Sequence, residues 1–108
     1  MKPDALQKTL SAVGLCKKAG GAIFGTEMVC DALRENKRVC LVIVPSDNSE
    51  NTRKKISDKC AFYRVDLKEL PASGETLAHA AGKSGHCAAL GVTDHNFAQL
   101  LSKAMQDL

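Results

Sequence analysis

"VCLVIVPSDNSENTRKK", residues 39–55, joins a run of apolar residues to a strongly polar one, and this junction indicates where a strand ends and a helix begins. A short apolar run without alternation is typical of a strand that is covered on both faces of a sheet. Asp47, Ser49 and Glu50 follow it directly, and such side chains satisfy the first backbone N–H groups of a helix. The stretch therefore predicts a buried strand followed by a capped helix over residues 49–61.

The basic residues of this helix leave two interpretations open. Lys55 and Lys59 share one face, whereas Ile56 and Cys60 turn inward. A solvated face explains the pattern fully, and the sharper alternative is a surface that contacts the phosphates of an anionic polymer.

The rest of the chain repeats the alternation of helices and strands. A second apolar run, "CAALGV" at residues 87–92, predicts another buried strand, whereas Ile23 and Phe24 form only a short apolar link. The pattern predicts an α/β fold, a three-layer α/β/α sandwich, in a single domain over residues 1–108. Helices are expected over residues 3–18, 26–36, 49–61, 73–81 and 94–106, with Ser73 and Asp94 as N-caps and Gly82 as a C-terminal glycine.

Charge and composition narrow the class of partner. Residues 1–64 carry 12 bases and 7 acids, whereas residues 65–108 carry 3 bases and 5 acids. A basic first half is compatible with a polyanion, although an ordinary solvated surface is the simpler interpretation of charge alone. The chain has one Tyr, three Phe and no Trp. So few aromatic residues argue against recognition of unpaired bases by several stacking rings.

The five cysteines and three histidines show no pattern of a metal or catalytic site. The cysteines are widely spaced without a C-x-x-C pair, and the first residues contain no apolar signal segment, so we expect reduced, mostly buried thiols in the cytoplasm. No segment is long enough to span a membrane. His86 and Cys87 are adjacent, and on a strand they would point to opposite faces. We therefore expect no enzyme, no metal and no cofactor.

The stretch "AGGAIFGTEMVCDAL", residues 19–33, carries the most specific signal for binding. A glycine at a helix start leaves backbone N–H groups open to a phosphate, and Gly25 lacks the Cβ that would block close approach. Glu27 accepts hydrogen bonds when ionised, so it suits the amino groups of bases. The ordinary alternative is that Thr26 caps the helix and Glu27 complements its dipole, and the residues alone favour this alternative.

Four segments together resemble the ribosomal protein L7Ae/L30e superfamily of kink-turn RNA-binding proteins. The similarity is strongest to small bacterial members described as ribosomal-protein-like. It covers nearly the whole chain, from about residue 10 to residue 105. The segments are "LSAVGLCKKAGGAIFGTEMVCDAL", "LVIVPSDNSENTRKKISDKCAFY", "ETLAHAAGK" and "GVTDHNFAQLL".

The resemblance implies a mixed four-stranded sheet, no catalytic centre and a defined mode of binding. In this family the glycine-led helix start lies in the widened groove of a kinked duplex, against tandem sheared G·A pairs, and a loop before the last strand covers a flipped-out base. The partner implied is structured RNA, either a kink-turn or ribosomal RNA, with the ribosome as a further partner. We expect a monomer. The candidate RNA-binding residues are Lys18, Gly25, Thr26, Glu27, Met28, Asp31, Lys83, His86, Cys87 and Ala88.

A second function remains open at this stage. Asp31 and Gly21 stand where family members carry bases, and the loop "KSGHCAA" is more polar than the family's apolar loop. These residues are compatible with a protein-interaction module, on a ribosome or a regulatory complex, that has lost specific recognition of kink-turns.

Overall fold

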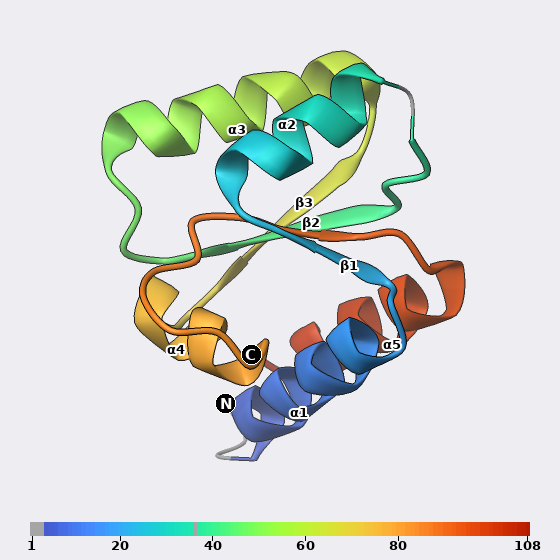
Figure 1. Cartoon of the computed structure of the whole chain (residues 1–108). Helices are drawn as coiled ribbons and strands as arrows, with labels where there is room; N and C mark the ends of the chain where they lie inside the picture. Colours follow the sequence, from blue (N-terminus) through green and yellow to red (C-terminus); the bar gives the residue numbers. More distant parts are fainter. Residues whose placement is uncertain (1–3, 36) are drawn as a thin grey trace.

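The computed structural model describes residues 4–35 and 37–108, and within them the chain forms three layers. A four-stranded sheet lies in the middle, with helices covering both of its faces (Figure 1). The predicted three-layer α/β/α sandwich is confirmed. One outer layer consists of α2 (Thr26–Arg34) and α3 (Glu50–Tyr63), and the other of α1 (Ala5–Lys18), α4 (Gly74–Ala80) and α5 (His95–Met105).

The sheet consists of β1 (Ala22–Phe24), β2 (Leu41–Pro45), β3 (Asp66–Leu70) and β4 (Leu90–Val92). The strands lie in the order β1-β4-β2-β3. β2 runs parallel to β3, and the other two pairs are antiparallel. The central strands β2 and β4 are buried along their whole length, as their apolar runs predicted.

The structure corrects the strand predictions in three places. β1 includes Ile23 and Phe24, which the residue pattern predicted only as a link. β3 has no counterpart among the strands predicted from the residues. β4 begins at Leu90, so His86 and Cys87 lie in a loop and not on opposite faces of a strand.

Side-chain caps begin three of the helices, as predicted. The Ser49 hydroxyl accepts a hydrogen bond from the Thr52 N–H at 3.3 Å, and Ser73 caps α4 in the same way. The Asp94 carboxylate accepts from the Phe97 N–H at 3.1 Å and caps α5. These bonds satisfy donors that a helix start otherwise leaves without partners.

Two predicted caps are wrong. Asp47 does not cap α3, because its carboxylate accepts a hydrogen bond from the backbone of Gly74, at the start of α4. Thr26 does not cap α2 either, since the N-cap is Gly25 and no side chain bonds there. The predicted helices over 3–18 and 26–36 match α1 and α2, although residues 3 and 36 lie outside the described residues.

The core has one half on each face of the sheet, because successive residues of β2 point to opposite faces. Leu41 and Ile43 pack toward α1 and α5 in one half, and Val42 and Val44 pack toward α2 and α3 in the other. Each fully buried side chain of this size contributes about 1.5–3 kcal/mol. Both halves together hold the strand ends, and hence the loops beyond them, in fixed positions.

Across residues 4–35 and 37–108, none of the helices combines the length and the apolar character that crossing a membrane requires.

Candidate functional site

The start of α2 is an open surface. Gly25 has φ 102° and ψ 150°, a conformation that residues with a Cβ rarely adopt. No side chain caps this helix start, and the first N–H groups of a helix lack partners within the helix. A Cβ added at Gly25 would meet no atom within 4 Å. The backbone here is therefore accessible to a close-fitting ligand.

The side chains of the first turn also face outward. Met28 is 61% exposed and Glu27 is exposed, whereas the next residue, Val29, is fully buried in the core. Thr26 is half-buried. The turn thus presents an apolar side chain, a carboxylate and backbone donors on one small surface, and the protein's own side chains do not cover it.

Two residues that set this chain apart from the family pattern have particular environments. The Asp31 carboxylate lies 2.6 Å from the guanidinium of Arg34, which offsets its negative charge. Gly21 is buried, and a Cβ there would lie 3.0 Å from the Cβ of Asp94. A basic side chain at position 21 would therefore not fit in this backbone without a shift. Neither residue by itself prevents an anion from binding at the α2 surface.

The loop over residues 83–88 lies beside the start of α2. The amide of Gly25 donates a hydrogen bond to the Ala89 carbonyl at 2.9 Å, directly after the loop. At the other end of the loop, the Lys83 ammonium lies 5.8 Å from the centroid of the Phe24 ring, in β1. Two of the predicted groups of residues, far apart in the sequence, are thus brought together by the pairing of β1 with β4.

Within this loop, Lys83 and His86 are exposed, Ala88 is half-buried and Cys87 is fully buried. The Cys87 thiol donates to the Ala89 carbonyl at 3.2 Å. Burial raises the pKa of this thiol from 9.0 to about 11, although backbone hydrogen bonds oppose the shift. Cys87 therefore anchors the loop from within, and its exposed neighbours form the surface.

Two residues in the segment that follows β2 fix the position of the loop by hydrogen bonds. The side-chain amide of Asn48 donates to the Ala88 carbonyl at 2.9 Å. The Asp47 carboxylate accepts from the Gly74 N–H at 2.9 Å, and the Gly74 carbonyl accepts from the Cys87 N–H at 2.9 Å. This chain of bonds ties the loop to both β2 and α4, so the loop is shaped before any ligand arrives.

His86 also contacts the segment that follows β2 and the start of α4. One ring nitrogen lies 3.3 Å from the side-chain oxygen of Asn48, and a Cβ at Gly74 would overlap the imidazole. The ring therefore packs directly on the glycine that begins α4.

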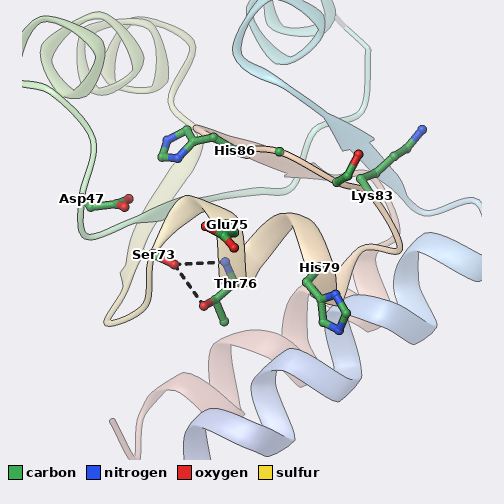
Figure 2. A pocket seen from close by; sticks show the side chains of 9 residues that line it. Asp47, Ser73, Glu75, Thr76, His79, Lys83 and His86 are labelled. Carbon is green, nitrogen blue, oxygen red and sulfur yellow. Dashed lines mark hydrogen bonds between the residues drawn. The ribbon is translucent and has the colours of Figure 1, made fainter.

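A hollow of about 830 Å³ lies between α4 and the loop (Figure 2). Its donors and acceptors suit hydrogen bonds to a polar ligand. Among the described residues, no three His, Cys, Asp or Glu side chains are grouped so as to hold a metal ion. The hollow is lined by Asp47, Ser73, Glu75, Thr76, His79, Lys83, Ser84, Gly85 and His86.

Lys18 lies close to the start of the loop over residues 83–88. It is exposed at the end of α1, and it lines a groove together with Gly82, the residue before Lys83. Lys55 and Lys59, by contrast, lie on α3 and line neither the hollow nor this groove.

Sequence reasoning missed three residues that shape this site. Phe24 lies under Lys83, Asn48 holds Ala88, and Gly74 makes room for His86. The run of polar side chains after β2 was a signal for Asn48, since the carboxyl end of a central strand in an open α/β sheet commonly carries ligand sites.

Comparisons with known proteins agree with this architecture. The model of the Ribosomal protein L7Ae/L30e/S12e/Gadd45 family matches residues 7–102. A protein of Enterococcus faecium named RNA-binding protein YlxQ is 36% identical over 93 residues, 86% of each chain. The RNA-binding protein YlxQ of Bacillus subtilis (strain 168) is 36% identical over 89 residues, which cover 82% of this chain and 86% of that protein.

Two solved structures have the same fold. A Bacillus halodurans C protein of unknown function superposes with a TM-score of 0.83 at 33% identity, over 92% of this chain and 97% of that one. The Giardia lamblia 15.5kD RNA binding protein superposes with a TM-score of 0.75 at 14% identity, over 99% and 89%, a likeness of fold alone. The matched family is not one of enzymes, which confirms the prediction of a non-catalytic protein. This chain belongs to the Ribosomal protein L7Ae/L30e/S12e/Gadd45 family.

Proposed function

We propose that this protein binds structured RNA, and that its target is a kinked duplex with sheared G·A pairs. The observation that carries the proposal is the surface formed by the open start of α2 and the loop over residues 83–88, which the Gly25–Ala89 hydrogen bond joins at 2.9 Å. Its relatives in E. faecium and B. subtilis bear the name RNA-binding protein, which supports RNA as the ligand.

Each exposed group has a role in this proposal. Gly25 lets the backbone approach the widened groove, and the free N–H groups of the first turn donate to RNA oxygens. Glu27 accepts from the amino groups of bases. Met28 and Ala88 cover apolar base surface, and the cations of Lys18 and Lys83 contact phosphates. Such a site reads the shape of a helix and its exposed edges.

A binding titration tests the specific form of the proposal. The dissociation constant is measured by fluorescence anisotropy for a kink-turn duplex and for the same duplex with its G·A pairs replaced by Watson–Crick pairs. We expect the control duplex to bind at least about tenfold more weakly. Equal affinities would remove the claim of kink recognition.

A pair of matched variants locates the contact. Met28 and Leu100 are both exposed leucine-sized side chains, at 61% and 49%, but α2 and α5 cover opposite faces of the sheet. Met28→Asp replaces the apolar contact with a base by a negative charge beside the polyanion, and we expect it to weaken binding about tenfold or more. Leu100→Asp should leave the affinity unchanged. Equal losses in the two variants would mean that the RNA binds elsewhere.

We further propose ribosomal RNA as the target class in the cell, with the protein acting as a monomer. The family description names ribosomal proteins, which supports this choice. Co-sedimentation with ribosomes before and after nuclease treatment tests it. Retention on ribosomal protein after removal of the RNA would favour the protein-interaction module instead.

A further inference from the structure

The outer surface of α3 exposes an aromatic ring that the fold leaves uncovered. Phe62 is 76% exposed, the largest value among the exposed large hydrophobic side chains of the described residues. Its ring meets the Tyr63 ring edge to face, with the centroids 4.9 Å apart and the planes at 85°. Such a pair fixes the orientation of Phe62 while leaving most of its surface in water.

Lysines extend this ring into a stripe. Lys55, Lys59 and Phe62 follow one another at spacings of four and three residues, which places them on one face of the helix. With Asp58 and Tyr63 they line a shallow hollow of about 420 Å³.

The neighbouring charges leave this stripe positive. Asp58 pairs with Lys54 at 3.6 Å, and Arg53 pairs with Glu69 at 3.3 Å. Among the described residues, neither Lys55 nor Lys59 has a carboxylate within 4.0 Å. The two ammonium groups are therefore available to an anionic partner.

We propose that the stripe formed by Lys55, Lys59 and Phe62 binds a single-stranded RNA segment that continues from the duplex at the α2 surface. This inference rests on the proposed function. A splayed base stacks on the Phe62 ring, and the lysines contact the adjoining phosphates, which is how sequence-tolerant single-strand sites work. A duplex would not supply this contact, because its bases are stacked on one another.

The arrangement of the helices supports a continuous path. α2 and α3 lie side by side on the same face of the sheet (Figure 1). The start of α3 adjoins the loop over residues 83–88, since Asn48 bonds to Ala88. The stripe runs from there toward the end of α3. An RNA strand that leaves the duplex must therefore follow α3 over about 20 Å.

The sparse aromatic content of the chain argues against a platform of several rings, but one exposed ring suffices for a single stacked base. The expected contribution is accordingly that of one stack, and the affinity for single strands alone should be modest and strongly dependent on salt.

The test compares a kinked duplex with and without an oligouridine tail. We expect the tail to strengthen binding by wild-type protein about tenfold, as one base–aromatic stack does. Phe62→Ala should abolish this gain while leaving the affinity for the blunt duplex unchanged. Lys55→Gln should lower the salt dependence for the tailed duplex by about 0.7 in slope. Leu100→Ala and Lys103→Gln, which change exposed residues of α5, are the matched controls.

Three outcomes would overturn the inference. The first is that the tail does not change the affinity, and the second is that the increase in affinity from the tail persists in Phe62→Ala. The third is that Phe62→Ala changes only the sedimentation of the free protein, which would mean that a second copy covers the ring. A second arm separates this inference from the proposed function. If no duplex binds, oligouridine alone is titrated at low salt, where binding that Phe62→Ala abolishes supports the stripe and absent binding removes it.

Discussion

The contact between Gly74 and His86 shows how one missing side chain shapes the site. A Cβ at Gly74 would overlap the imidazole of His86, which packs on the glycine and reaches Asn48. His86 is exposed, so its ring can swing aside. We predict that Gly74→Ala lowers the free energy of unfolding by about 1 kcal/mol, near the lower end of overpacking effects. Urea denaturation measures this loss.

A double-mutant cycle isolates the cause. In a His86→Ala background, the Cβ that Gly74→Ala adds meets no imidazole, and the effect of the substitution on stability should largely disappear. An unchanged loss in that background would show that the backbone of α4, and not the imidazole, needs the glycine.

Asp47 illustrates what local sequence patterns leave undetermined. Its spacing to Glu50 is that of a helix cap, yet its hydrogen bond goes to Gly74, 27 residues away. Ser49, whose partner Thr52 is three residues away, was predicted correctly. Local patterns thus identify local partners, whereas the long-range partner depends on where the loop before α4 lies in the fold.

Among the elements, the position of a strand in the sheet determined whether its residue pattern predicted it. The central strands β2 and β4 are covered on both faces, so they appear as continuous apolar runs. The strands β1 and β3 lie at the edges. β1 has only three residues, and β3, "DLKEL", mixes charged and apolar residues because it is partly exposed. Only the family resemblance implied four strands.

The cap of α3 gives a prediction for a whole element. Ser49 accepts a hydrogen bond from the Thr52 N–H, and α3 has a weak apolar face, with Ile56 and Cys60 as its buried residues. Ser49→Ala should lower the free energy of unfolding by about 1 kcal/mol. Ser57→Ala, an exposed change within the same helix, is the control and should be neutral or slightly stabilising, since alanine favours helix. Equal effects in urea denaturation would mean that the cap is unimportant.

For the molecule as a whole, the candidate site depends on topology more than on any motif. The residue pattern predicted the helix start at Gly25 as a candidate binding surface, and the family resemblance predicted the loop over residues 83–88, but their separation along the chain hides their proximity. The antiparallel pairing of Phe24 with Leu90 brings them together. The support from Asn48 follows from the place of β2 beside β4. The sequence thus predicted the parts, and only the sheet order could show how they meet.

Burial of thiols in both halves of the core predicts how global stability depends on pH. Burial raises the pKa of Cys16, Cys60 and Cys87 from 9.0 to about 11. Asp94 adds to the shift at Cys16, and Cys30 adds to that at Cys60. The folded state therefore retains these protons after the unfolded state has released them. The resulting stabilisation is fully present below pH 9 and is lost as the pH rises to about 11.

Urea denaturation between pH 8 and about 11 measures this loss. The informative quantity is the difference between wild-type protein and Cys60→Ala, because this difference isolates the contribution of one buried thiol. We expect the pH-dependent loss to be smaller in the variant by on the order of 2 kcal/mol, since one pKa unit corresponds to about 1.4 kcal/mol. Cys40→Ala is the control, because this thiol is only half-buried. Identical pH profiles for wild type and Cys60→Ala would contradict the prediction, because they would require the Cys60 thiol to ionise as readily in the folded core as in the unfolded chain.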